Sequence, residues 1–157
     1  MEQKKFKKVN MNSEINYQNN TLLKKFVNLL MIHGKKRKAE KLLLNIFKNL
    51  HKRTKKPPIQ FFFQGLTNIS PIVNVQSVRV RRRSYQVPFP LTREKQFILG
   101  MKWLIQLCRK HKSDSFVNSF NQQIILASQK KGDLIKKRND LHKLAKLSRP
   151  FANYRWL

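Results

Sequence analysis

Four arginines crowd the point where two short β-type segments meet, within the run VNVQSVRVRRRSYQV from Val73 to Val87. They are Arg79, Arg81, Arg82 and Arg83. Turns between strands are usually made of Gly, Asn or Asp, which tolerate the backbone conformations that tight turns require. Cations placed there instead repel one another unless an anion lies nearby. The run therefore predicts an exposed hairpin whose tip binds phosphate, with RNA or DNA as the ligand.

Three further groups of basic residues could bind phosphates of the same partner. One group opens a predicted helix, one follows the outer side of the last predicted helix, and one lies in the C-terminal tail. Their members are Lys35, Lys36, Arg37 and Lys38; Lys136, Lys137, Arg138 and His142; and Arg149 and Arg155. Arginine suits this role because its planar guanidinium pairs with two phosphate oxygens and stacks on bases. Any single lysine here could instead belong to a solvated helix face.

Aromatic residues near these cations leave two interpretations open. Tyr154 and Trp156 could stack on unpaired bases, a common route to sequence-sensitive RNA recognition, or they could pack against the domain. The triplet Phe61–Phe63 could also stack on bases. Its second and third members share a helical face with Leu66, however, which favours packing in the core.

The residue pattern does not indicate catalysis or metal binding. The chain has only four glycines, and no two lie close enough to form a phosphate-cradling loop. The histidines and Cys108 show no metal-ligand spacing. Asp140 stands near Lys136, Lys137 and Arg138, with which it is expected to form a helical ion pair. We therefore expect no enzyme activity, no cofactor, no metal and no small-molecule substrate.

The composition favours a folded protein that binds a polyanion. Lysine and arginine number 35 against 7 acidic residues, which gives a formal net charge of +28. Phosphate groups relieve this self-repulsion, and binding them releases counterions. Because 40 % of the 157 residues are hydrophobic, including 11 Phe, the chain can form one domain with a core. The basic residues are spread along the chain, which suggests burial among several phosphate strands.

The compartment is constrained by three features of the sequence. Cys108 is the only cysteine, which favours a reducing environment. Apolar runs are too short for a membrane helix, so no membrane association is expected. The N-terminus is basic but is interrupted by Glu2 and Glu14 and resembles no presequence. If the protein works in an organelle, we expect that it is made there.

Helical periodicity predicts a mainly α domain of six helices over 21–157, with one β-hairpin over 72–91 between the third and fourth. The helices are expected from Thr21 to His33-Gly34, over 35–50, from Ile59 to about Asn68, after Thr92 through Cys108, from Ser113 or Asp114 through Ala127, and from Gly132-Asp133 through Ala145. Residues 1–20 lack periodicity, which predicts a flexible basic arm, and 149–157 form a C-terminal tail.

The two predicted strands differ in pattern. Because proline cannot donate to a ladder, Pro88 and Pro90 predict that the returning strand is an edge strand or leaves the ladder early. On the outgoing strand the valines change phase between Val75 and Val78, which predicts a bulge or a strong twist near Ser77. A two-stranded ribbon is marginally stable alone, so its base must pack on helices while its tip projects.

Three segments, taken in order, carry a family resemblance. They read LLKKFVNLLMIHGKKRKAEKLL, ISPIVNVQSVRVRRRSYQVP and KKRNDLHKLAKLSRPFANYRW. The most specific pieces are Gly34-Lys35-Lys36, Tyr85-Gln86-Val87-Pro88 and Phe151-Ala152-Asn153-Tyr154-Arg155-Trp156. From Thr21 to Trp156, nearly the whole chain, the sequence resembles the small-subunit ribosomal protein seven family.

The resemblance implies six helices with a hairpin between the third and fourth, in agreement with the periodicity. It also implies a structural protein that binds the 3′ (head) domain of small-subunit ribosomal RNA, helps to nucleate head assembly and contacts other small-subunit proteins. Members of the family lie at the exit-tRNA site, which implies that Arg81, Arg82, Arg83 and Tyr85 at the hairpin tip lie near tRNA and messenger RNA.

The sequence departs from the family pattern at the hairpin bend. Two glycines are usual there, whereas this chain has Arg81-Arg82, so a wider or distorted tip is expected. The N-terminal arm is basic but does not have the sequence that is usual for the family's basic segment. The bias towards Lys, Asn and Phe, together with the divergent turn, favours a mitochondrial member, with plastid or bacterial origin as the alternative.

Two other functions compete with this interpretation. An organellar nucleoid protein could insert the basic helix start, from Lys35 to Lys41, into a groove of duplex DNA. An RNA-modifying enzyme is a third class, but the missing cofactor loops argue against it.

Overall fold

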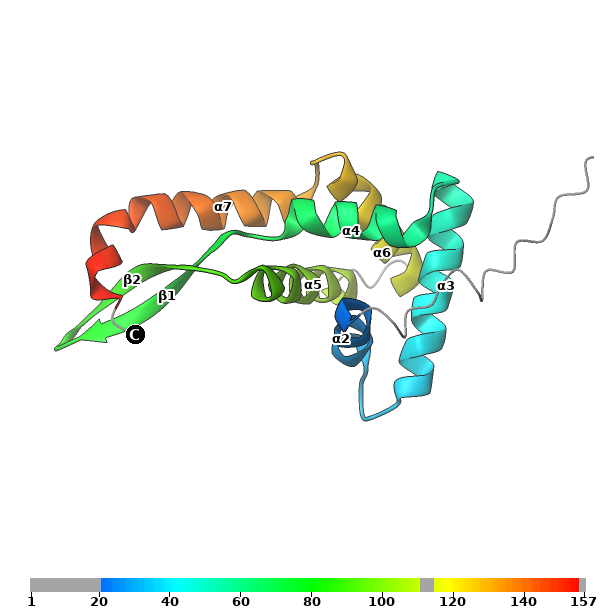
Figure 1. Cartoon of the computed structure of the whole chain (residues 1–157), viewed down its shortest axis with the longest axis horizontal. Helices are drawn as coiled ribbons and strands as arrows, with labels where there is room; N and C mark the ends of the chain where they lie inside the picture. The colour runs from blue at the N-terminus through cyan, green and yellow to red at the C-terminus, as the bar shows by residue number, and fades with distance from the viewer. Residues whose placement is uncertain (1–20, 111–114, 156–157) are drawn as a thin grey trace, which may run out of the picture.

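The computed structural model describes residues 21–110 and 115–155 (Figure 1). Its elements are α2 (Thr21–Leu30), α3 (Lys36–Thr54), α4 (Pro58–Ile69), β1 (Val73–Val80), β2 (Arg83–Pro90), α5 (Arg93–Lys110), α6 (Phe116–Ser128), α7 (Asp133–Leu147) and the 3-10 helix η2 (Arg149–Tyr154). The predicted fold class is confirmed, because the hairpin lies between the third and fourth of the six α-helices described. The predicted arm over 1–20, the possible caps Ser113 and Asp114, and Trp156 lie outside these residues.

The molecule is elongated, with a helical body at one end and the hairpin at the other (Figure 1). Helices α4, α5 and α7 run along the long axis, and α3 crosses it at the end farthest from the hairpin. The strands leave the body, and η2 turns back from the end of α7 to contact β2. The hairpin tip therefore projects while its base packs on α7. This arrangement was expected because two strands alone are marginally stable.

A cluster of phenylalanines forms the centre of the helical body. Phe62 on α4 is fully buried, and its ring centroid lies 5.2 Å from that of Phe26, 5.9 Å from Phe47 and 6.2 Å from Phe120. The neighbouring Phe63 is half-buried and packs against the same core. The core interpretation of the aromatic triplet is confirmed, because Phe61 and Phe62 are buried in the core cluster and Phe63 packs against it.

Helix boundaries differ from the periodic pattern where the backbone enters the left-handed region. Helix α2 ends at Leu30, and His33 and Gly34 then form a turn with φ of 52° and 70°. Helix α3 continues past the predicted end at Leu50 as far as Thr54, where Lys55 closes it with φ of 53°. The residues after Leu50 are polar, so the apolar stripe ends there. The helix continues because its backbone hydrogen bonds form without an apolar partner.

The hairpin has a continuous register, which excludes the bulge near Ser77, the first of the two predicted alternatives. The pairs run without a break from Val73 opposite Pro90 to Val80 opposite Arg83, and Ser77 pairs with Gln86. A bulge is needed only where one face must stay buried throughout, and every residue of β1 is half-buried or exposed. The edge prediction is confirmed, because the sheet described has two strands.

The turn at the tip is tight, which overturns the expectation of a wider bend. Since Val80 pairs with Arg83, only Arg81 and Arg82 lie between the strands. Arg81 takes a left-handed conformation with φ of 53°, the conformation that the expected glycine would have supplied. A side chain in this region costs about 1–2 kcal/mol, which is tolerable in one residue.

Cys108 on α5 gives a test of the core that is independent of function. The thiol is buried in the core cluster, and burial raises its pKa to about 12. We expect a thiol reagent at pH 8 to leave the native protein unlabelled and to label one thiol after denaturation, because the thiolate is the reactive form. Rapid stoichiometric labelling of the native protein, absent from a Cys108→Ser control, would contradict this packing.

Candidate nucleic-acid interface

The tip of the hairpin presents its arginines to solvent. The side chains of Arg79, Arg81, Arg82 and Arg83 are exposed. Among the described residues, no carboxylate lies within salt-bridge distance of any of them. The two-residue turn thus holds a concentrated positive charge that no neighbouring acid neutralises, which suits it to phosphate.

The second basic group lies at the start of α3, at the opposite end of the long axis (Figure 1). Lys35, Lys36, Arg37 and Lys38 are all exposed, and the first turn of α3 contains no acidic residue. Lys35 caps the helix without a side-chain hydrogen bond. Because the N-terminal end of a helix is itself positive, these side chains add to an uncompensated positive field.

The basic group on α7 divides into outward and inward members. Lys136 and Lys137 are exposed; Lys136 lies 3.7 Å from Asp133, and Lys137 lies 5.0 Å from the ring centre of Trp103. Such surface contacts are weak enough to leave both ammonium groups available to a ligand. The expected ion pair of Asp140 forms with Lys143 instead, at 4.0 Å, because that residue lies one turn further along the helix.

Arg138 and His142 point towards the body of the protein. Arg138 Nη1 donates to the backbone oxygen of Asn68 at 2.6 Å, and its other nitrogens donate to Asn139 Oδ1. His142 Nε2 accepts the backbone N–H of Ile72 at 3.2 Å. These bonds fix α7 to the end of α4 and to the segment that leads into β1, so both residues position the base of the hairpin.

Stability is expected to depend on pH through His142. Burial, and then the charge of Arg138, lowers the pKa of His142 below its ordinary value of 6.5. Below pH 6.5 the histidine is therefore protonated more readily in the unfolded chain than in the folded protein. The stabilisation that is present above this pH is lost as the pH falls. Urea unfolding at pH 7.5 and 5.5 measures the free energy of unfolding. Between these pH values it should fall less for His142→Gln than for the wild type, because glutamine accepts the same hydrogen bond without titrating. Equal losses in the two proteins would contradict the assignment.

The C-terminal segment joins the hairpin. The ring of Tyr85 on β2 lies 5.1 Å from that of Phe151 and 5.0 Å from that of Tyr154. Tyr154 is half-buried and its ring contacts Tyr85 and Phe151, which favours the packing interpretation for this residue. The predicted cations Arg149 and Arg155 are exposed. Tyr154 also lines one hollow with Val80 and with Arg81, Arg82 and Arg83, which together we call the arginine turn. Two segments distant in sequence therefore meet at the tip.

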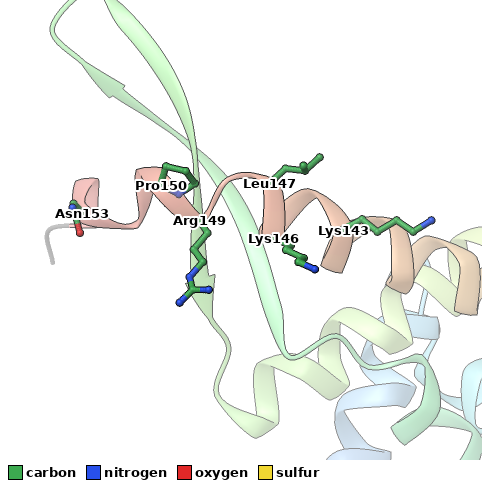
Figure 2. Close-up of a pocket in the computed structure, with 6 residues that line it drawn as sticks. All are labelled: Lys143, Lys146, Leu147, Arg149, Pro150 and Asn153. Atoms are coloured by element: carbon green, nitrogen blue, oxygen red, sulfur yellow. The ribbon is translucent and has the colours of Figure 1, made fainter.

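The sequence interpretation missed two lysines on the outer side of α7. Lys143 and Lys146 join Arg149 around a hollow of about 940 Å³ at the junction with η2. Figure 2 shows Lys146 and Arg149 extending from one side of the junction and Leu147 from the other. The spacing of three residues between these cations would have placed them on one helical face.

Other kinds of site find no support in the described ranges. No group of three or more His, Cys, Asp or Glu side chains there could hold a metal ion. Nor is any helix in those ranges both long and apolar enough to cross a bilayer.

The whole sequence identifies the protein family. Residues 1–149 match the family described as ribosomal protein S7p/S5e. The chain belongs to this family. The S7p/S5e match confirms the resemblance drawn from three segments, and it begins at residue 1, earlier than the Thr21 at which that resemblance started.

Curated relatives of S7p/S5e type match over most of their length. Small ribosomal subunit protein uS7m of Reclinomonas americana is 38 % identical over 138 residues, covering 88 % of this chain and 87 % of the relative. Protein uS7 of Allorhizobium ampelinum is 39 % identical over 132 residues, with 84 % and 85 % covered. Protein uS7 of Colwellia psychrerythraea is 38 % identical over 137 residues, with 87 % and 88 % covered.

Family membership makes this chain a small-subunit ribosomal protein. Ribosomal RNA binding and a part in translation follow from that membership, and the S7p/S5e family is a family of structural proteins, generally without catalytic activity. The nucleoid and RNA-modifying interpretations are thereby disfavoured. Mitochondrial and bacterial relatives are equally similar, so identity alone assigns the ribosome and not the compartment.

Proposed function

We propose that this protein binds the 3′ (head) domain of small-subunit ribosomal RNA, helps to nucleate head assembly and lines the exit-tRNA site. In this proposal the hairpin tip lies near tRNA and messenger RNA, and the helical body contacts ribosomal RNA and neighbouring small-subunit proteins. The observation that carries the proposal is the exposed arginine turn, which no described carboxylate neutralises.

The separation of the basic groups supports a ligand with several strands. The α3 lysines and the arginine turn lie at opposite ends of the elongated molecule (Figure 1), so one straight duplex segment does not easily reach both. A folded RNA presents phosphates in many directions, and proteins recognise such RNA largely by its shape. Binding at both ends would fix the relative positions of two RNA segments, which is what nucleating a domain requires.

The described contacts support a division of the predicted residues into two proposed roles. The exposed cations Lys35–Lys38, Arg79, Arg81–Arg83, Lys136, Lys137, Arg149 and Arg155 are assigned to phosphate. Arg138 and His142 are assigned to positioning, because their nitrogens already bond to Asn68, Asn139 and Ile72. Breaking those bonds to reach a phosphate would offset much of the gain.

Competition binding tests the ligand class. A labelled transcript of the 3′ domain should bind tightly and should be displaced by the same RNA far better than by duplex DNA of equal length. The salt concentration must be fixed, since each phosphate contact contributes to the salt dependence. Displacement by duplex DNA as good as or better than that by the RNA would favour the nucleoid function instead.

We also propose that the ribosome concerned is mitochondrial. The composition biased towards Lys, Asn and Phe and the divergent turn support this, as does the similarity to uS7m of Reclinomonas americana. Sedimentation of a mitochondrial extract through a high-salt gradient should place the protein with small subunits, in one copy for each subunit. Its recovery only with plastid or cytosolic ribosomes would refute the compartment and leave the family untouched.

A further inference from the structure

The hairpin that carries the arginine turn has little support of its own. It consists of two strands, and among their residues Val87 alone is buried. At the base, the N–H of Ile72 is held by His142, and α7 contacts β1. A free ribbon of eight residues on each side would otherwise bend and twist relative to the body. Something nearer the tip must therefore fix its direction.

Three aromatic rings lie in contact close to the turn, where they can fix the direction of the hairpin. Tyr85 lies two residues from Arg83 on the same strand, which is about 7 Å, and it pairs with Val78 across the hairpin. Its ring contacts Phe151 and Tyr154 of η2, and the rings of Phe151 and Tyr154 stack 6.5 Å apart. We call these three residues the aromatic clamp. All three are half-buried, so the rings cover one another.

We infer that Tyr85, Phe151 and Tyr154 are positioning residues, which hold the arginine turn at a fixed angle to the helical body so that it meets RNA already oriented. This inference rests on the proposed RNA binding by the tip, and it assigns the C-terminal 3-10 helix a role separate from direct contact. The hollow lined by Tyr154 and the three turn arginines shows how near the clamp lies to the charges that it directs.

The clamp acts through entropy. A loose hairpin has to be ordered when it binds, and the cost of that ordering is subtracted from the affinity. Aromatic pairs of this geometry contribute enough to change an equilibrium by about two- to tenfold. The final complex contains the same number of phosphate contacts with or without the clamp. The salt dependence of the affinity should therefore not change.

The test compares Phe151→Ala with a matched control, Phe116→Ala. Phe116 is also half-buried and also pairs with another ring, Phe120 at 6.1 Å, but it lies on α6 in the helical body. Hydrogen exchange is measured first, on the free proteins. Backbone amides of β1 and β2 near the tip should exchange about two- to tenfold faster in Phe151→Ala and at the wild-type rate in Phe116→Ala. Unchanged exchange in Phe151→Ala overturns the clamp.

Binding to the 3′-domain transcript then separates positioning from direct stacking on RNA. Phe151→Ala should weaken affinity by about two- to tenfold with an unchanged salt slope. In a background where Arg81, Arg82 and Arg83 are alanine, the same substitution should have little further effect, because positioning acts through those arginines. A full additional loss in that background would show that Phe151 touches RNA itself and would overturn the inference.

The design keeps two failures apart. If wild-type protein does not bind the transcript, the proposed function fails, while hydrogen exchange still reports on the clamp. If Phe151→Ala loses helical structure by circular dichroism, Phe151→Leu replaces it, since leucine keeps the apolar bulk and removes the ring contacts. Wild-type exchange and affinity in Phe151→Leu would show that generic apolar contact suffices, which also overturns a clamp made of rings.

Discussion

Changing Arg81, Arg82 and Arg83 together to glutamate is expected to weaken binding to the 3′-domain RNA by a factor on the order of a hundred to a thousand. Three contacts at about 1–1.4 kcal/mol each account for this range. The slope of log affinity against log salt should flatten by about 2–3, because each lost phosphate contact removes roughly 0.7–0.9. Filter binding at several salt concentrations gives both quantities.

Two controls separate the tip from the general charge of the protein. Changing Lys24, Lys48 and Lys95 to glutamate alters the net charge by the same amount at exposed positions on α2, α3 and α5. That variant should lose far less affinity. Changing the three turn arginines to lysine keeps the charge and removes the bidentate fork, so the salt slope should persist while affinity falls moderately. Equal losses in the two glutamate variants would mean that the tip has no special role.

Replacing Phe62 with alanine is expected to lower the free energy of unfolding by about 3–5 kcal/mol. The ring is fully buried and touches Phe26, Phe47, Phe63 and Phe120, so its removal leaves a cavity among four elements. A loss of this size is a large share of the stability of a small domain. Urea unfolding followed by circular dichroism, at a salt concentration that screens the high net charge, measures it.

The half-buried neighbour provides the comparison for this second prediction. Phe63→Ala should lower the free energy of unfolding clearly less than Phe62→Ala, since part of the Phe63 ring already faces solvent. If the two substitutions cost the same, or if Phe62→Ala costs less than about 1 kcal/mol, the phenylalanine cluster is not the centre of the core. RNA binding by folded Phe63→Ala should remain normal, because Phe63 lies in no basic group.

Periodicity was a good guide to the helical body and a poor one to the hairpin. Leu23, Phe26, Leu43 and Ile46 are buried as the apolar stripes predict, because a helix buries whatever lies on one face. The valines of β1 follow no such rule, since neither face of the projecting ribbon is fully covered. The phase change near Ser77 therefore needed no bulge.

The contacts that orient the candidate site could not be predicted from local sequence. Arg138 looked like one more surface cation, yet its guanidinium reaches Asn68, 70 residues earlier in the chain. Tyr85 and Phe151 meet across a similar gap. Such contacts depend on the angle between α7 and the hairpin, which no single segment specifies. The tight turn at Arg81 is a different case, because a general preference for glycine did not exclude one left-handed arginine.

Directed cleavage from the hairpin tip tests the central claim most directly. Two proteins are prepared in a Cys108→Ser background, one with a hydroxyl-radical probe attached at Arg82→Cys and one with the probe at Lys38→Cys. Each protein is then reconstituted into small subunits. We predict RNA cleavage confined to the 3′ domain from both sites, at different segments, because the hairpin and α3 lie at opposite ends of the molecule. Cleavage in other domains, or the same pattern from both probes, would contradict a protein that binds the head RNA at two ends.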